Sequence, residues 1–331
     1  MIRPGKRNLI TDVPGIRVGN AQDRTIGTGA TVIFPETSLV CAIDERGGAP
    51  GTQQVSLHAP EAVRGNADAI VFSGGSLYGF GAANGVTAEL GKAGIGAGLL
   101  GTVVPSVPSA IIFDLLAMKH RDWLADPPYD RLGREALAKV DVDFDLGSVG
   151  AGIGASACSF AGGLGSASAE TDDGLIVGAL AVVNSFGEVV VPGTRNFWAW
   201  PFEYGDEFGG HGAPQGQAPL FPELSLPVPL REPGMSTTLI AVATNATLDK
   251  GALKRVAIMA QTGMARAIRP VHTLFDGDVV FALATCEREQ SDPVTQTLVG
   301  NLAADCTARA IARAVYSATS HETLPVFKDR Q

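Results

Sequence analysis

Seven apolar segments along the chain predict buried strands, separated by polar or glycine-containing connections. Several of them lack the alternation of apolar and polar residues that marks a half-exposed strand. Continuous apolar runs of this length are typical of sheets covered on both faces. The predicted strands are residues 28–34, 39–44, 68–72, 109–115, 175–183, 238–244 and 279–285.

Two helices are predicted in the last third of the chain. Asp249 is a suitable N-cap for the first, and apolar residues at helical spacing follow it. They are Leu253, Val256, Ala257, Ala260, Met264, Ala267 and Ile268. The second begins after Asp292, with Pro293 in its first turn, and extends through Ala318. Strands and helices mixed without strict alternation predict a layered sandwich with helices outside.

Residues 211–234 contain six prolines in 24 residues and predict an extended, exposed approach. The approach leads directly to Ser236-Thr237-Thr238, and an apolar strand follows at once. Two readings are open. The triplet is either the polar start of an ordinary edge strand, which the pattern alone favours, or the site of a nucleophile.

Composition and charge exclude several classes of protein. The 331 residues are 45% hydrophobic and 18% charged, which argues against disorder. A net charge of −9 argues against a binder of nucleic acid or of an acidic membrane surface. The basic N-terminus is followed by no apolar signal core, and no apolar run is long enough to span a membrane, so a cytoplasmic protein is expected.

Cysteines and histidines show no metal-binding spacing. The four cysteines lie far apart, form no C-x-x-C, and are expected to be small buried thiols in a reducing compartment: Cys41, Cys158, Cys286 and Cys306. The five histidines form neither H-x-x-x-H nor H-E-x-x-H: His58, His120, His211, His272 and His321. These spacings therefore predict no structural zinc site.

Two glycine-containing segments are similar to known functional motifs but do not match their spacing. GAGIGA at 150–155 has G-x-G-x-G spacing and follows a poor strand, which favours a backbone-packing loop. A nucleotide-binding oxidoreductase is the alternative it leaves open. Around Ser76 the sequence is GGSLYG, with Tyr78 where a nucleophile elbow needs its second glycine. A serine–histidine triad therefore has little support.

One kind of nucleophile needs no histidine. If the chain is cut before a serine or threonine, the new α-amine becomes a base beside the hydroxyl. Such a residue should begin a strand and be preceded by a segment that can leave after the cut. The start of the strand at 238–244 has this arrangement.

Blocks along nearly the whole chain resemble the P1 (S58) peptidases. They include NLITDVPGIRVGNAQ, DERGGAPGT, FSGGSLYGFGAANGV, GSVGAGIGASA, AVVNSFGEVV, STTLIAVATNATL and RPVHTLFDGDVVFALAT, in this order. The family includes L-aminopeptidase D-amidase/esterases, β-peptidyl aminopeptidases and nylon-oligomer hydrolases. The resemblance implies one domain over 1–331 with a four-layer αββα sandwich, similar to N-terminal-nucleophile hydrolases but with different connectivity.

The resemblance also implies self-cleavage between Ser236 and Thr237, into subunits 1–236 and 237–331. Thr237 would then be the nucleophile, with Thr238 as the less favoured neighbour. Asn184 matches the asparagine that helps hold the oxyanion, although Asn-Ser-Phe-Gly is also a good turn. Asp276 and Asp278 match an acidic pair that orients the amine and hydroxyl, although Asp-Gly-Asp is also a turn signal.

The chain departs from the family pattern at three positions. Ser236 precedes the predicted cut, where the family often has Asn or Gly. Ser159 follows Cys158 where the family usually carries Gly-Lys, and Phe113 stands where the nylon-oligomer hydrolase branch has a tyrosine. A missing ammonium would leave the acidic pair less compensated. The missing lysine and tyrosine support an alternative: a non-catalytic relative that keeps the fold as a binding or scaffold protein.

The resemblance implies an amide hydrolase that acts on small peptides or linear amide oligomers from the amino end. It would work through an acyl-enzyme on Thr237, without a metal or an organic cofactor. It also implies a homo-oligomer, a tetramer of processed pairs. An aromatic cluster is expected to serve packing, with a substrate cleft or an oligomer contact as the other readings: Trp198, Trp200, Phe202 and Tyr204.

Overall fold

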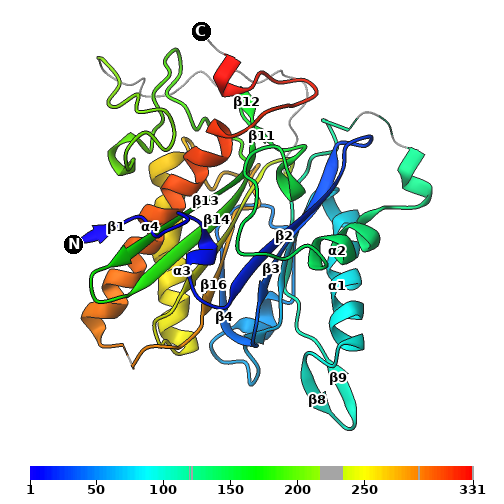
Figure 1. Ribbon diagram of the computed structural model, residues 1–331. Coiled ribbons are helices and arrows are strands. Elements are labelled where there is room, and N and C mark those ends of the chain that lie inside the picture. The colour runs from blue at the N-terminus through cyan, green and yellow to red at the C-terminus, as the bar shows by residue number, and fades with distance from the viewer. Residues whose placement is uncertain (119, 121, 217–233, 290, 330–331) are drawn as a thin grey trace.

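The computed structural model describes residues 1–118, 120, 122–216, 234–289 and 291–329. Two β-sheets form its centre (Figure 1). The seven-stranded sheet has the order β1 (Ile2–Arg3), β13 (Gly163–Thr171), β14 (Ile176–Asn184), β15 (Thr237–Thr244), β16 (Val279–Ala284), β4 (Leu39–Glu45) and β6 (Asn66–Ala67). The five-stranded sheet has the order β2 (Ile16–Asp23), β3 (Thr28–Pro35), β7 (Ile70–Ser73), β10 (Ser109–Ile111) and β5 (Thr52–Gln53).

Helices cover the outer face of each sheet. Figure 1 shows α3 (Lys250–Ala267) and α4 (Pro293–Tyr316) beside the seven-stranded sheet, and α1 (Gly81–Lys92) and α2 (Tyr129–Leu137) on the far side of the five-stranded sheet. Two small hairpins complete the strands: β8 (Ala97–Leu99) with β9 (Thr102–Val104), and β11 (Ser156–Ala157) with β12 (Phe160–Ala161). The predicted four-layer αββα sandwich is confirmed.

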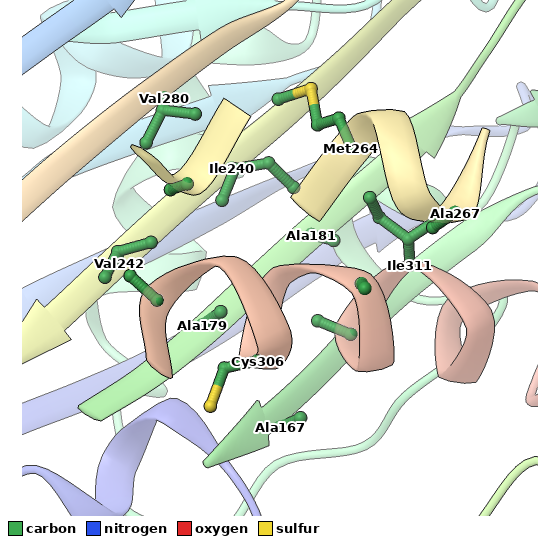
Figure 2. Packing of buried hydrophobic residues seen from close by; sticks show 14 of the residues in the cluster. Ala167, Ala179, Ala181, Ile240, Val242, Met264, Ala267, Val280, Cys306 and Ile311 are labelled. Carbon is green, nitrogen blue, oxygen red and sulfur yellow. The ribbon is translucent and has the colours of Figure 1, made fainter. Parts of the chain in front are cut away.

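The central strands are buried on both faces, as their continuous apolar sequences predict. On β15, Ile240 and Val242 belong to the core beneath α3 and α4, whereas Leu239 and Ala241 belong to the core between the sheets. Figure 2 shows the first of these cores, with Met264 of α3 and Ile311 of α4 in front of the strands. A third core lies between the five-stranded sheet and α1 and α2. The strand that carries Thr237 is thus fixed from both sides.

The predicted elements are confirmed, with shifts at their ends. All seven predicted segments contain a strand, although the segment 109–115 is a strand only as far as Ile111. The Asp249 side chain accepts from the Ala252 N–H at 2.8 Å, and Asp292 accepts from the Thr295 N–H at 2.7 Å. Both aspartates are therefore helix N-caps, as predicted. The last helix ends at Tyr316, two residues before the predicted end.

The GAGIGA segment packs backbone against backbone. Its first residues form a short 3₁₀ turn (Gly150–Gly152), and strand β11 rather than a helix follows it. A Cβ on Gly152 would lie 2.3 Å from the Leu164 backbone nitrogen. The packing-loop interpretation is confirmed, because a dinucleotide loop needs a helix N-terminus at this point.

One prediction about the cysteines is wrong. Cys41, Cys158 and Cys306 are buried, but Cys286 is exposed, because it follows the end of β16 in a surface connection. Cys41, Cys286 and Cys306 are free thiols. In the part of the chain that the structure describes, no helix has both the length and the apolarity needed to cross a membrane. Most of the predicted proline-rich approach, residues 217–233, lies outside the described residues.

Candidate active site

Three adjacent strands bring the predicted residues to one end of the seven-stranded sheet. Strand β15 pairs antiparallel with β14, so that Thr237 lies opposite Asn184. On its other side β15 pairs parallel with β16, which follows directly after Asp278. Thr237, Asn184, Asp276 and Asp278 come from three distant segments and are all buried. The structure therefore brings these four predicted residues together.

The Ser236–Thr237 peptide has a defined hydrogen-bond environment. The Thr237 hydroxyl donates to the Ser236 carbonyl oxygen at 2.5 Å, and the Gly277 N–H donates to the same oxygen at 2.8 Å. The Ser236 N–H donates to the Phe275 carbonyl at 3.1 Å. Among the described residues, the buried Thr238 hydroxyl has no hydrogen-bond partner. Of the two threonines, only Thr237 has its hydroxyl against the carbonyl of the predicted cut.

The carboxylates of the acidic pair have separate donors. Asp278 accepts from the Thr238 N–H at 2.8 Å, and its other oxygen lies 2.9 Å from Nδ1 of His272. Asp276 accepts from the Phe186 N–H at 3.1 Å and from the Thr273 hydroxyl at 2.6 Å. Burial, together with the nearby charge of Asp278, raises the pKa of Asp276 to about 6.

The segment 46–51 packs against the backbone of Asp276 and Asp278. The Arg46 N–H donates to the Asp278 carbonyl at 2.9 Å, and the Ala49 N–H donates to the Asp276 carbonyl at 2.9 Å. A Cβ on Gly47 would lie 2.3 Å from the Asp278 nitrogen, and one on Gly277 would lie 2.8 Å from the Thr237 hydroxyl. Both positions need glycine because backbone or hydroxyl fills the space.

Asn184 is the last residue of β14, and both ends of its side-chain amide form hydrogen bonds. Its Oδ1 accepts from the Ser156 N–H at 2.9 Å and from the Ser156 hydroxyl at 3.1 Å. Its Nδ2 donates to the Phe113 carbonyl at 3.2 Å. One amide hydrogen is thus held by Phe113 and not by the Ser236 carbonyl. The oxyanion role of Asn184 stays a prediction.

A cavity of about 450 Å³ adjoins the predicted cut. Its walls include Phe113, Asp114, Ser156, Cys158, Met235 and His321. Met235 directly precedes Ser236, so the second residue before the predicted cut borders the cavity. Phe113 lies at this wall and offers a ring without a hydroxyl.

Ser159 and the aromatic cluster face elsewhere. The Ser159 hydroxyl donates to the Glu188 carboxylate at 2.8 Å, beside Cys158 of the cavity wall. Arginine guanidinium groups lie over three rings of the cluster, namely Trp198 (Arg269), Phe202 (Arg266) and Tyr204 (Arg309). Phe202 packs against the core beneath α3 and α4. The cluster does not line the Met235 cavity, but Phe202 and Tyr204 line a separate cavity of about 250 Å³, so the packing role stays a prediction.

Sequence reasoning missed two residues of this site. Gly277 donates the backbone hydrogen bond to the Ser236 carbonyl, but as the centre of Asp-Gly-Asp it carries only a turn signal. His272 contacts Asp278, yet it belongs to no histidine motif. Both lie inside the RPVHTLFDGD block. The resemblance of that block to the family was the only signal for them in the sequence.

Comparison with solved structures defines the class of the fold. The structure is similar to a Burkholderia β-aminopeptidase, with a TM-score of 0.71 and 21% identity over 96% of this chain and 89% of that one. It is also similar to the L-aminopeptidase D-Ala-esterase/amidase of Ochrobactrum anthropi, with a TM-score of 0.67 and 21% identity over 96% and 88%. That structure is described as a variant of the Ntn hydrolase fold. The protein has the fold of these aminopeptidases.

The chain belongs to peptidase family S58, whose model matches residues 8–325. It is 40% identical to an uncharacterized aminopeptidase of Mycobacterium tuberculosis (strain ATCC 25618 / H37Rv), over 97% of both chains. It is 31% identical to a 6-aminohexanoate-oligomer endohydrolase of Kocuria sp. (strain KY2), over 86% of this chain and 76% of that one. Membership makes it a hydrolase of peptide or amide bonds, with aminopeptidase or amidase activity.

Proposed function

We propose that the protein cuts itself between Ser236 and Thr237 and then uses Thr237 as an N-terminal nucleophile. The observation that carries this proposal is the pair of hydrogen bonds on the Ser236 carbonyl oxygen, from the Thr237 hydroxyl and from the Gly277 N–H. The hydroxyl is held against the carbonyl that it must attack. The Gly277 N–H is held where it can stabilise the negative charge that develops on the oxygen.

Self-cleavage takes two steps. The Thr237 oxygen attacks the Ser236 carbonyl carbon, the carbon–nitrogen bond breaks, and the acyl group moves to the oxygen as an ester with a free α-amine. Water then hydrolyses the ester, which leaves a carboxylate on Ser236 and a free threonine N-terminus. The freed amine next accepts the hydroxyl proton when Thr237 attacks a substrate.

Substrate turnover uses the same space as the processing ester. An acyl-enzyme on Thr237 is the same chemical species as that ester, with the substrate's acyl group in place of Ser236. Ser236 and Thr237 are both buried in the intact chain. Departure of the segment before the cut opens a path from the Met235 cavity to the nucleophile. The acyl group of the substrate then lies at that cavity, near Phe113 and Ser156.

The substrates proposed are small peptides and linear amide oligomers. The names of the mycobacterial and Kocuria relatives support both classes. No metal or organic cofactor enters the proposed chemistry. Assembly as a homotetramer of processed pairs and a cytoplasmic location stay predictions.

The test measures turnover in purified wild-type protein, Thr237→Ala and Thr237→Ser. Aminoacyl p-nitroanilides and linear 6-aminohexanoate oligomers are the two probes. Wild-type protein should release product from one of them. Thr237→Ser should retain part of the rate because it keeps a hydroxyl, and Thr237→Ala should have none. Full activity in Thr237→Ala would place the nucleophile elsewhere, and inert wild-type protein would favour the scaffold alternative.

A further inference from the structure

His272 lies in an unusual backbone conformation next to the acidic pair. It belongs to the segment that connects α3 to β16, and its φ is +56°. Residues other than glycine seldom adopt this left-handed region, and those that do are concentrated at functional sites. This conformation brings both the backbone N–H and the ring of His272 to the same oxygen of Asp278, at 3.1 Å and 2.9 Å.

The contact fixes one proton of the imidazole ring. A carboxylate oxygen only accepts hydrogen bonds, so Nδ1 of His272 must be the donor to Asp278. The His272 side chain is 23% exposed, whereas that of Asp278 is 1% exposed. The imidazole therefore links a buried carboxylate to the solvent side of the site.

The acidic pair has no other cationic partner in the described ranges. His272 is the only Lys, Arg or His there that forms an ion pair with Asp276 or Asp278. Arg46 belongs to the segment 46–51 that packs against the pair, but the Arg46 guanidinium binds Asp44 at 2.7 Å. The other groups that donate to the pair are uncharged: the Thr238 N–H of β15, the Phe186 N–H after β14, and the N–H and hydroxyl of Thr273.

We propose that His272 is a positioning residue: in its protonated form it holds Asp278 and offsets the charge of the acidic pair, so that the freed Thr237 amine stays neutral. The inference rests on the proposed function. Two uncompensated carboxylates near an amine favour its charged form and raise its pKa. A charged amine cannot accept the hydroxyl proton. A cation on Asp278 weakens that effect and favours the neutral amine.

The test compares pH–rate profiles of the wild-type protein, His272→Asn and His272→Ala. Asparagine tolerates positive φ and provides an N–H donor near the position of Nδ1, but it carries no charge. In His272→Asn, the acid limb of turnover should move to higher pH by roughly one unit, because the ammonium is no longer opposed. In His272→Ala the donor is lost as well, so its maximum rate should fall further than that of His272→Asn.

His120→Asn is the matched control, because His120 also lies near an aspartate (Asp122, 3.8 Å) but on the surface. Its profile should superimpose on that of the wild-type protein. If His272→Asn is also superimposable while the wild-type protein is active, this inference is wrong and the proposed function stands. If the wild-type protein neither cuts itself nor turns over substrate, the proposed function fails, and the role of His272 fails with it.

Discussion

Two groups of buried charges in this molecule differ in how far cations compensate their carboxylates. At the candidate active site, two buried carboxylates, Asp276 and Asp278, lie two residues apart just before β16, with a single partly exposed histidine as cationic partner in the described structure. In the 203–209 segment, the single carboxylate of Glu207 contacts two arginines. Arg309 binds it with two bonds, at 2.6 Å and 3.0 Å, and Arg313 lies 3.7 Å away.

The two arrangements shift the pKa of a buried carboxylate in opposite directions. Burial raises the pKa of Asp276, and the charge of Asp278 adds to the effect. Burial also acts to raise the pKa of Glu207, but Arg309 and Arg313 outweigh it, so the net shift is downward. A compensated cluster of this kind ties α4 to the chain around it. An under-compensated pair is unfavourable for folding and is typical of a site that handles protons.

The largest expected effect is on activity at the acidic pair. Asp278→Asn removes the charge that faces His272 and the strand start, so self-cleavage and turnover should both slow by about 10²-fold or more. The measurement is the rate of fragment formation on a denaturing gel, together with turnover of an aminoacyl p-nitroanilide. Fragment formation at the wild-type rate would remove Asp278 from the proposed chemistry.

The next effect is on stability at the compensated cluster. Glu207→Gln leaves Arg309 buried without its anion and should cost about 3–5 kcal/mol of unfolding free energy. Urea titration gives this value. Folded protein should still cut itself, because the cluster does not touch the Ser236–Thr237 peptide. A loss below about 1 kcal/mol would mean that the arginines do not depend on Glu207.

A smaller effect with a defined pH dependence is expected for Asp276→Asn. The folded-state pKa of Asp276 is raised from 3.8 to about 6. Its contribution to stability is therefore present below pH 3.8 and is lost as the pH rises through 6. Relative to the wild-type protein, Asp276→Asn should thus gain about 2 kcal/mol between pH 4 and pH 7. Thermal unfolding at several pH values measures this gain, and a constant difference would contradict it.

The smallest effect is expected at an exposed ion pair. Arg17 and Glu36 approach to 2.8 Å, but both side chains are at least 41% exposed. Glu36→Gln should change the unfolding free energy by no more than about 1 kcal/mol, because water screens the pair. The same urea titration serves as the control for Glu207→Gln. An equal loss of unfolding free energy in Glu36→Gln and Glu207→Gln would show that burial does not make the Glu207 cluster more stabilising than the exposed pair.

Apolar patterns predict the fold well where side chains fill the space. They fail at β13, whose sequence GLGSASAET contains few large apolar residues. A Cβ on Gly165 would lie 2.0 Å from the Ala310 carbonyl oxygen, so the close approach of α4 requires small residues there. The glycine-rich block that contains α1 is similar, because Gly85 lies against the Asp130 carbonyl of α2. Such strands and helices have no hydrophobic signal to detect.

The site was predictable only in part, and for a related reason. Thr237, Asn184, Asp276 and Asp278 were identified through a family resemblance, since each also has an ordinary turn or strand interpretation. Gly277 acts through its backbone N–H, which no residue type encodes. The role of His272 depends on a positive φ that brings its ring to Asp278, and one sequence does not indicate that conformation.

The central claim is that Thr237 cuts the chain at its own N-terminal side. Intact mass measurement of purified wild-type protein beside Thr237→Ala tests it most directly. The wild-type protein should give fragments of 236 and 95 residues, the smaller one beginning Thr-Thr-Leu-Ile, and Thr237→Ala should remain a single chain of 331 residues. A wild-type chain that stays intact on prolonged incubation, or a Thr237→Ala chain that is cut at the same bond, would contradict the account.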